Sequence, residues 1–341
     1  MNPNLNPELL IYSGLPASGK TSAAFEWVAE DPTHRSRVNY DDLRIKLFGS
    51  TWRFNWEDEA RMKKEADDIT RTYLEGGYSV VIDNTNLTEH ERNHWTALGE
   101  SCGASIAFQD FDTSTDVCIQ RDKIREKRVG RAVIEWMALS YGFLDLNNRD
   151  EYPNDFIICD VDGTLADGSH RKHFVEAPED VGQFHKLDCS LLGKCLVWPY
   201  IKDTRCKECG GGFRKDWYSY LTRCADDAPI EPIFEALKRL SGEAVGSIKY
   251  DILVVSGRPI DLCGIATEDW LDRWFMEHGM TYRHLFMRRN GKFPDYEVKQ
   301  AILDLLPKER IKYVLDDRAS VCNQTWRANG LTCLQVAEGN F

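Results

Sequence analysis

One short motif constrains the fold of this chain more than any other feature. Residues 14–21 read Gly-Leu-Pro-Ala-Ser-Gly-Lys-Thr and fit the pattern G-x-x-x-x-G-K-[ST] at every position. An apolar run at residues 9–12 precedes the motif, and a helical pattern over residues 21–29 follows it. Glycines let backbone N–H groups close on phosphate oxygens, and the N-terminus of the following helix adds a partial positive charge. The motif and its context therefore predict a phosphate-binding loop between a strand and a helix.

The residues of this loop also predict its ligand. Lys20 is expected to reach the β- and γ-phosphates of a nucleoside triphosphate, and the Thr21 hydroxyl is expected to bind Mg²⁺. Gly14, Ser18 and Gly19 complete the predicted ATP-binding set. The motif alone does not decide whether the bound triphosphate is hydrolysed or donates its phosphoryl group.

Length and composition limit the class of protein. A chain of 341 residues, of which 42% are hydrophobic, is long enough for two domains with separate cores. No apolar run approaches the roughly 18 residues of a membrane span, and we expect no membrane segment and no secretion signal. The net charge of −12 argues against a generally basic coat for nucleic acid but leaves room for a local basic groove. The 11 cysteines are interpreted as reduced thiols of a cytoplasmic protein.

Short apolar runs that end in polar residues recur in both halves of the chain. They are predicted to be strands and lie at residues 9–12, 80–82, 106–108, 156–159, 252–255 and 313–315. Helical stretches alternate with the first three runs, and the polar segment at residues 147–154 reads as a linker. The pattern predicts two α/β domains with parallel sheets, residues 1–148 and 154–341. In such sheets chemistry gathers at the carboxyl ends of the strands.

Two acidic positions of the first half follow predicted strands. Residues 38–40 read as a short strand that ends at Asp41, with Arg44 one helical turn further on. If that strand pairs beside the first strand, Asp41 could accept the proton of an acceptor hydroxyl and Arg44 could hold an anionic acceptor. A helix N-terminus with acids in its first turn explains the same residues equally well. Asp83 is open to two interpretations as well, an acid near Mg²⁺ or a plain strand-end turn.

The segment 121–131 is unusually basic for an acidic protein. Its cations are Arg121, Lys123, Arg125, Lys127, Arg128 and Arg131, against Asp122 and Glu126. A solvated helix face is the ordinary explanation of such a run. The alternative is a mobile lid, because phosphoryl-transfer enzymes need arginines that close over the transferring group.

The second half carries a set of phosphatase-like motifs. Asp160 and Asp162 follow an apolar strand within Asp-Val-Asp-Gly-Thr, so that one carboxylate can attack phosphorus while the other handles protons. This pattern resembles the first motif of the haloacid dehalogenase superfamily. The later motifs resemble it in order: Ser256-Gly257-Arg258, whose hydroxyl would hold the phosphate, then Lys299, then Asp316-Asp317 for Mg²⁺.

The combination of the two motif sets resembles the phage-type bifunctional polynucleotide 5′-kinase/3′-phosphatases over nearly the whole chain. The resemblance implies a P-loop kinase domain followed by a Rossmann-like haloacid dehalogenase phosphatase domain. In the kinase it implies Asp41 as general base and Arg44 as the group that holds the acceptor phosphate. It implies Arg125 as the lid arginine, with Arg128 as the alternative.

For the phosphatase the resemblance implies Asp160 as nucleophile and Asp162 as acid/base. The remaining site residues by this resemblance are Arg171, Arg258, Asp295, Lys299, Asp316 and Asp317, with Mg²⁺ at Asp160, Asp162, Asp316 and Asp317. The expected activities are transfer of the ATP γ-phosphoryl group to 5′-OH ends of RNA or DNA, and removal of a 3′-phosphate or 2′,3′-cyclic phosphate through an aspartyl-phosphate.

The resemblance also implies a setting for these activities. The product ends suit a ligase, the protein is expected to be a homo-oligomer, and it would work in the host cytoplasm if a phage encodes it. Two alternatives stay open. One is a small-metabolite kinase fused to a small-metabolite phosphatase, since both folds host many substrates. The other is a non-catalytic protein that binds nucleic-acid ends, against which Lys20, Thr21, Asp160 and Asp162 all count.

An insert at about residues 176–212 separates Arg171 from the later motifs. It contains Cys189, Cys195, Cys206 and Cys209, with His185 as a substitute for one of the first pair. Cys206-Lys-Glu-Cys209 looks like a zinc knuckle, and zinc would stabilise a short insert that lacks a core. Four free thiols in a reducing compartment explain the cluster about equally well, because the spacing of the other pair is irregular.

Overall fold

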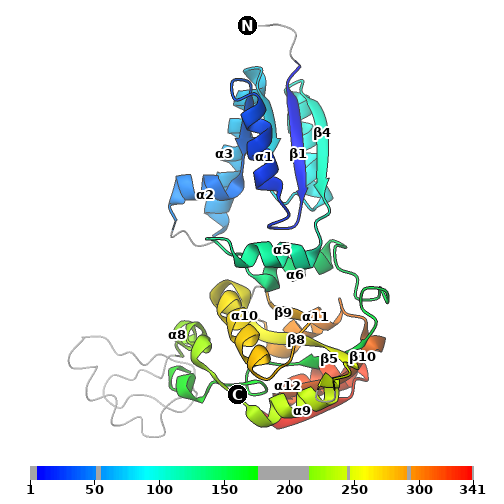
Figure 1. The fold of residues 1–341 in the computed structure, drawn as a ribbon. Coiled ribbons are helices and arrows are strands. Elements are labelled where there is room, and N and C mark those ends of the chain that lie inside the picture. The colour runs from blue at the N-terminus through cyan, green and yellow to red at the C-terminus, as the bar shows by residue number, and fades with distance from the viewer. Residues whose placement is uncertain (1–5, 51–54, 176–214, 244–245, 290–292, 340–341) are drawn as a thin grey trace, which may run out of the picture. The chain divides into compact units, whose positions relative to one another are not determined.

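The computed structural model describes residues 6–50, 55–175, 215–243, 246–289 and 293–339. The chain divides into two compact units, Met1–Val129 with Trp136–Leu144 and Gly130–Glu135 with Asp145–Phe341. Each unit contains its own parallel sheet with helices beside it (Figure 1). The predicted α/β class with two sheets is therefore confirmed. None of the helices in the described ranges is long and apolar enough to cross a membrane.

The sheet of the first unit has the strand order β2-β3-β1-β4, and all neighbours are parallel. Its strands are β1 (Glu8–Gly14), β2 (Arg35–Val38), β3 (Ser79–Ile82) and β4 (Ser105–Phe111). These bounds include the runs predicted at residues 9–12, 80–82 and 106–108. The central strand β1 ends at Gly14, which delivers the phosphate-binding motif to the carboxyl edge of the sheet.

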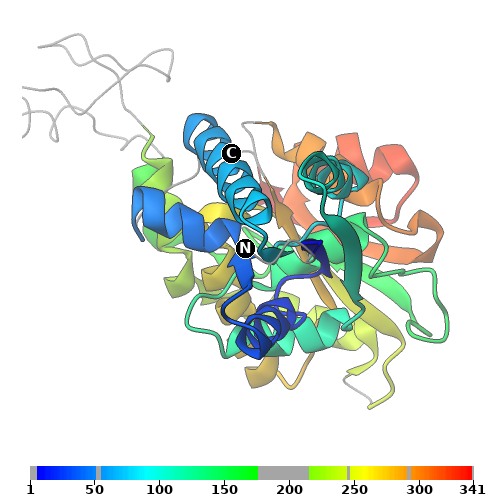
Figure 2. The ribbon, with the colours of Figure 1, turned by 90° about the horizontal axis from the view of Figure 1, so that it is seen from above.

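Helices cover both faces of this sheet. They are α1 (Lys20–Glu30), α2 (Tyr40–Phe48), α3 (Trp56–Glu75), α4 (Glu89–Ser101) and α5 (Thr115–Lys123), while α6 (Arg131–Ser140) belongs partly to each unit. Successive side chains of a strand point to opposite faces. Leu9 and Ile11 therefore join a core with α3 and α4, whereas Leu10 and Tyr12 pack with α1. Figure 2 shows α1 and α3 on opposite sides of β1.

The strand expected at residues 38–40 ends earlier than predicted. β2 stops at Val38, and Asn39 caps α2 by accepting a hydrogen bond from the Asp42 backbone N–H. Asp41 therefore lies in the first turn of a helix. In addition, β2 pairs with β3 and not with β1. The polar cap residue ends the strand because its side chain satisfies a backbone donor of the helix.

The sheet of the second unit has the order β11-β10-β5-β8-β9 and is also parallel. Its strands are β5 (Asp155–Cys159), β8 (Tyr250–Pro259), β9 (His284–Arg288), β10 (Ile311–Arg318) and β11 (Cys333–Gly339). A small antiparallel pair, β6 (Ala166–Asp167) and β7 (Ala228–Pro229), lies in the same unit. β5 is the central strand, and the motif that begins at Asp160 follows it directly.

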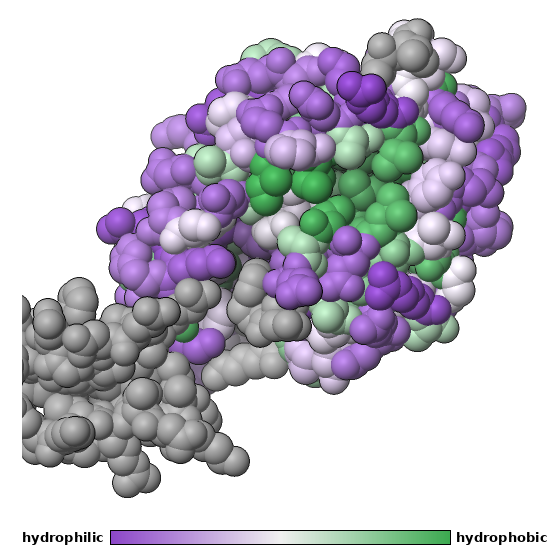
Figure 3. All heavy atoms as spheres, turned by 90° about the horizontal axis from the view of Figure 1, so that it is seen from below, coloured by the Kyte–Doolittle hydropathy of each residue, from purple (hydrophilic) through white to green (hydrophobic). Residues whose placement is uncertain are grey.

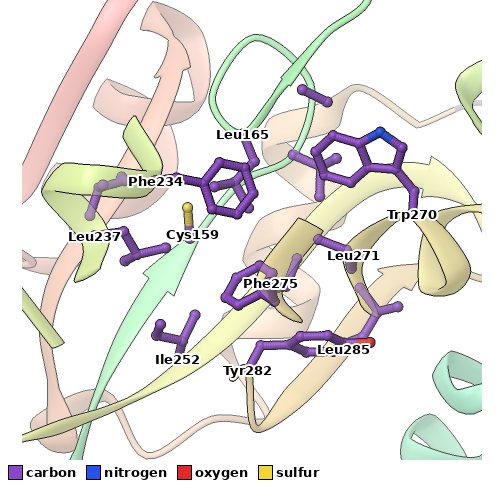
Figure 4. Close-up of a cluster of buried hydrophobic side chains, with 14 of the residues drawn as sticks. Cys159, Leu165, Phe234, Leu237, Ile252, Trp270, Leu271, Phe275, Tyr282 and Leu285 are labelled. Atoms are coloured by element: carbon purple, nitrogen blue, oxygen red, sulfur yellow. The ribbon is translucent and has the colours of Figure 1, made fainter. Parts of the chain in front are cut away.

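The helices of this unit include α8 (Trp217–Thr222), α9 (Glu231–Ser241), α10 (Ile260–Glu277), α11 (Asp295–Leu303), α12 (Ala319–Val321) and the 3₁₀-helix η1 (Ser169–Phe174). α9 and α10 pack on one face of the sheet through Phe234, Trp270 and Phe275, as Figure 4 shows. Trp270 also donates its indole N–H to the backbone carbonyl of Asp227 at 2.7 Å. The core therefore fixes a loop that contributes to the site described below.

Some apolar surface remains on the molecule. Figure 3 shows one face on which apolar residues gather in an area framed by polar ones. On the second unit, the edge strand β11 leaves the side chain of Leu334 exposed.

Candidate active sites

The phosphate-binding loop of the first unit has the predicted strand–loop–helix geometry. Gly19 precedes α1 with a φ of 108°, a left-handed conformation that favours glycine. The Lys20 ammonium donates hydrogen bonds to the carbonyls of Gly14 at 2.9 Å and Leu15 at 2.6 Å, and to Ser18 Oγ at 3.2 Å. Burial lowers the pKa of Lys20 to about 8. The loop thus holds a desolvated cation at the N-terminus of a helix, which suits a polyphosphate.

Asp83, at the end of β3, lies beside this loop. Its carboxylate accepts a hydrogen bond from the Thr21 hydroxyl, and its Oδ2 accepts another from Arg37 Nε at 2.7 Å. Burial raises the pKa of Asp83, and Arg37 partly opposes that rise. Asn39, the cap of α2, donates to the Asp83 backbone carbonyl. A hydroxyl and a carboxylate in this position are hard oxygen ligands that suit Mg²⁺.

Asp41 and Arg44 lie together on α2, as their spacing predicted. Arg44 Nη1 is 2.5 Å from Asp41 Oδ1, and Asp41 is largely exposed. Glu59 of α3, which the sequence analysis did not single out, binds the other edge of the guanidinium. Its two oxygens accept from Arg44 Nη2 at 2.7 Å and Nε at 3.0 Å. Glu59 therefore fixes the plane of the Arg44 guanidinium.

Within the basic segment, Arg121 contacts the loop. Its Nη1 donates to the Ser18 carbonyl at 3.2 Å. Arg125 instead pairs with Asp122 at 3.4 Å and is 40% exposed, yet its charge also lowers the pKa of Lys20. The structure thus brings both arginines close to the loop, one in contact and one nearby.

The second unit gathers a buried cluster at the carboxyl ends of β5 and β10. Lys299 Nζ lies 2.8 Å from Asp160 Oδ1, 2.8 Å from Asp316 Oδ2 and 3.8 Å from Asp295 Oδ2. Burial raises the pKa of Asp160 well above its usual range, and the nearby carboxylates add to that rise while Lys299 opposes it. Trp326 donates its indole N–H to Asp316 Oδ2 at 2.9 Å. The Lys299 ammonium therefore lies within ion-pair distance of several carboxylates.

Asp160, Asp316 and Asp317 offer a cation site. Within the described residues, one carboxylate oxygen from each lies within 4.8 Å of the others, and all three side chains are buried. Gly163 has a φ of 77°, and a Cβ there would come within 2.3 Å of Asp317 Oδ2, so only glycine allows this approach. Burial and the neighbouring Asp316 raise the pKa of Asp317 to about 6. The site contains more buried carboxylates than side-chain cations to neutralise them, and carboxylate oxygens are ligands that suit Mg²⁺.

The Asp162 carboxylate lies in a second cluster, with two arginines. Arg258 Nη2 and Nε reach it at 2.7 and 2.9 Å, and Arg171 Nη2 reaches it at 2.6 Å. Burial would raise the pKa of Asp162, but the two guanidinium groups outweigh it and hold that pKa well below its usual range. Asp227, absent from the predicted site, binds both arginines from behind, with contacts of 2.6 Å.

Part of these two clusters lines a cleft with a volume of about 170 Å³. Its walls include Asp160, Asp162, Arg258, Asp295, Lys172, Lys215, Trp217, Arg288 and Arg318. Asp295 contacts the guanidinium of Arg288 at 3.2 Å and that of Arg318 at 3.4 Å. Ser256 is buried, and its hydroxyl accepts a hydrogen bond from the Arg258 backbone N–H. The cleft is thus acidic at one wall and basic around it, which suits a phosphate monoester with a divalent cation.

Comparison with known families separates the two units. Residues 9–144 match the family described as "AAA domain", and residues 213–341 match the family described as "Polynucleotide kinase PNKP phosphatase domain". The chain therefore joins a P-loop kinase domain to a polynucleotide kinase phosphatase domain. This pairing of domains supports the interpretation of the chain as a polynucleotide 5′-hydroxyl kinase and 3′-phosphatase that repairs nucleic-acid ends. It does not favour the alternative of a kinase and phosphatase for small metabolites.

Solved structures give weaker likenesses. A chain of the Pnkp1/Rnl/Hen1 RNA repair complex is 20% identical, with coverage of 100% of this chain and 99% of that chain and a TM-score of 0.37. The APS kinase CysC of Mycobacterium tuberculosis, in complex with AMPPNP and APS, is 19% identical, with coverage of 35% and 70% and a TM-score of 0.30. A gluconokinase from Sinorhizobium meliloti is 18% identical, with coverage of 42% and 78% and a TM-score of 0.29. TM-scores this low transfer no activity.

The sequence pattern does not indicate Glu59 or Asp227, and it names Arg121 only as one cation of the basic segment. Glu59 and Asp227 bind the side chains of other site residues, Arg121 binds the Ser18 backbone carbonyl, and none of the three occupies a motif position. Asp227 follows another acid, Asp226, before a proline, which reads as an ordinary turn. Their roles depend on contacts between distant segments, and no local pattern signals them.

The predicted zinc site lies outside the described residues. This applies to Cys189, Cys195, Cys206, Cys209 and His185. The cysteines within the described ranges are all free thiols.

Proposed function

We propose that the kinase domain phosphorylates 5′-OH ends of RNA or DNA with ATP, and that the phosphatase domain removes 3′-phosphates or 2′,3′-cyclic phosphates. The observation that carries this proposal is the presence of two separate phosphate-handling arrays on one chain. One is the loop with Lys20 and Thr21, and the other is the buried cluster of Asp160 and Lys299. The product ends, a 5′-phosphate and a 3′-OH, are the ends that a ligase joins.

In the kinase domain, Asp41 would accept the proton of the 5′-OH as that oxygen attacks the γ-phosphorus of ATP. Arg44, whose plane Glu59 fixes, would hold the phosphate next to the acceptor hydroxyl. Lys20 would bind the β- and γ-phosphates, and Arg125 would neutralise the transferring group. Thr21 is the residue that would hold Mg²⁺, which screens the phosphate charge when bound.

In the phosphatase domain, Asp160 would attack the phosphorus of the 3′-phosphate. The bond from phosphorus to the 3′-oxygen breaks, and Asp162 gives a proton to that oxygen. Water then attacks the aspartyl-phosphate, loses its proton to Asp162 and releases inorganic phosphate. Asp160, Asp316 and Asp317 would hold Mg²⁺, which offsets the charge of the phosphate dianion.

The two arginines connect substrate binding to Asp162. Arg171 and Arg258 now bind Asp162 and Asp227 together. Phosphate oxygens would compete with Asp162 for the same N–H groups, because guanidinium binds phosphate and carboxylate with similar geometry. Competition of this kind would free Asp162 from the two cations that hold its pKa low, so that Asp162 would take up a proton from solvent and give it to the leaving oxygen. Lys299 lies 2.8 Å from the Asp160 carboxylate and would favour its ionised, nucleophilic form together with the Mg²⁺ that this site would hold.

One substrate tests both halves. An oligonucleotide with a 5′-OH and a 3′-phosphate, in RNA and DNA versions, is incubated with the protein, ATP and Mg²⁺, and the products are weighed by mass spectrometry. We expect a phosphate gained at the 5′ end and a phosphate lost at the 3′ end. An oligonucleotide left unchanged by protein that phosphorylates nucleosides or sugars would overturn the proposal.

Two variants assign each half to its domain. Lys20→Ala removes the loop cation and should abolish phosphorylation while phosphatase activity persists. Asp160→Asn removes the nucleophile and should do the reverse. If either change abolished both activities in a folded protein, the two-site assignment would be wrong.

A further inference from the structure

An exposed tryptophan stands in the phosphatase cleft without a role in the proposed chemistry. Trp217 lines the cleft and is 52% exposed. It is the first residue of α8, whose N-cap Asp216 accepts a hydrogen bond from the Ser219 backbone N–H at 2.9 Å. The Asp216 N–H also donates to the Phe174 carbonyl at 2.8 Å. The backbone under Trp217 is therefore fixed, although most of its ring faces solvent.

Ring contacts connect Trp217 to the proposed acid/base. Trp217 meets Tyr220 edge-on at 5.6 Å between ring centroids, and the Arg171 guanidinium lies 4.1 Å over the Tyr220 ring. Arg171 in turn binds Asp162 at 2.6 Å. Trp217, Tyr220, Arg171 and Asp162 therefore contact one another in that order. A group that stacks on Trp217 is held at the outer end of this row of side chains.

The cations around Trp217 suit more than one phosphate. Lys215 lies over the indole, with Nζ 5.4 Å from the ring centroid, and Lys172, Arg288 and Arg318 line the same cleft. A single phosphate monoester would occupy the buried arginines near Asp162. Lys215 then lies where it could bind the phosphodiester that precedes a 3′-terminal nucleotide. An indole beside cations is the arrangement that binds single strands, since every base has a face that can stack.

We propose that Trp217 stacks on the terminal base of a single-stranded 3′-phosphate end and that Lys215 moves from the indole to the neighbouring phosphodiester. This inference rests on the proposed phosphatase function. It makes Trp217 a positioning residue that favours nucleic-acid ends over other phosphate monoesters.

The test compares two oligonucleotides that differ in one base. Both carry a 3′-phosphate, but the terminal nucleotide of one is abasic. Phosphate release is measured for the wild type, for Trp217→Leu and for Trp217→Phe. The matched control is Tyr218→Leu, because Tyr218 is the next residue of α8, is 51% exposed and does not line the cleft.

For the wild type we expect the substrate with the base to have a kcat/KM about 10-fold above that of the abasic substrate, a typical effect of one stacked base. In Trp217→Leu the ratio should fall toward one, through KM and not through kcat. Trp217→Phe should restore part of the ratio, and Tyr218→Leu should keep it whole. An unchanged ratio in Trp217→Leu would overturn the stacking role while phosphatase activity stands. Failure of the wild type to release phosphate from either oligonucleotide would overturn the phosphatase function itself.

Discussion

Both carboxylate oxygens of Asp227 accept hydrogen bonds from one edge of the Arg171 guanidinium, Oδ1 from Nε and Oδ2 from Nη2, each at 2.6 Å. Both side chains are buried. A two-point contact of this kind fixes the plane of the guanidinium, and Arg171 then presents Nη2 to Asp162 as well. Asp227 therefore positions the arginine that contacts the proposed acid/base, although it does not line the cleft itself.

Replacing Asp227 should impair the phosphatase without touching the kinase. Asp227→Asn keeps the shape but removes the charge that two buried arginines share, so kcat for 3′-phosphate removal should fall on the order of 100-fold. Unpaired buried charge should also cost about 3 kcal/mol of unfolding free energy. Steady-state kinetics and thermal unfolding measure the two effects.

The matched control for this change is Asp226→Asn, at the exposed acid one position earlier. It should leave both kcat and stability near the wild-type values. Equal losses in the two variants would show that the loop, and not the Asp227 carboxylate, matters.

Magnesium should stabilise the phosphatase domain. Asp160, Asp316 and Asp317 place their oxygens within 4.8 Å, and a bound cation would relieve their repulsion. Binding to the folded state alone adds about 2.7 kcal/mol when the metal is at 100 times its Kd. Calorimetric scans with Mg²⁺ and with EDTA should therefore differ for the wild type and coincide for Asp317→Asn. A metal-induced shift of equal size in that variant would exclude Asp317 as a ligand.

The predictable part of these sites follows from one geometric rule. Asp83 and Asp160 directly follow parallel strands, Thr21 comes after the loop that follows β1, and Asp316 lies near the carboxyl end of β10. Within each sheet the carboxyl ends of parallel strands meet at one edge. Residues far apart in sequence could therefore be placed together without any structure. The short strand at residues 38–40 was the exception, because a cap and a strand end both use polar residues there.

The less predictable part consists of residues that reach across the fold. Asp227 precedes β7 and meets Arg171 from 56 positions away, and Arg121 reaches Ser18 from 103 positions away. Neither contact leaves a periodicity, a spacing or a motif in the sequence. Only the packing of loops on helices brings these partners together.

The two arginines near the loop should have separable roles in the kinase. Arg121 donates to the Ser18 carbonyl, so Arg121→Ala should loosen the loop and raise the KM for ATP about 10-fold, as expected for one lost charged hydrogen bond. Arg125→Ala should instead lower kcat about 1,000-fold, as loss of an arginine on the transferring group does.

Kinase assays at varied ATP concentration separate these effects, and the exposed Lys127→Ala is the control for lost charge. A large loss of kcat in Arg121→Ala with an unchanged KM for ATP would show that Arg121, and not Arg125, acts on the transferring group.

Glu59 should matter for the acceptor and not for ATP. It holds Arg44 through Nε and Nη2 and leaves Nη1 for Asp41 or an acceptor phosphate. Glu59→Gln weakens a charged two-point contact, so the Arg44 guanidinium should no longer be held in one orientation. The KM for a 5′-OH acceptor with an adjacent phosphate should therefore rise about 10-fold. The KM for ATP should stay constant.

A double-mutant cycle decides whether Glu59 acts through Arg44. If it does, Glu59→Gln should have no further effect on the acceptor KM in an Arg44→Ala background, because coupled residues are not additive. Glu57→Gln, in the exposed first turn of the same helix, serves as the control. Additive losses from Glu59→Gln and Arg44→Ala would show that Glu59 supports α3 itself and has no part in orienting the guanidinium.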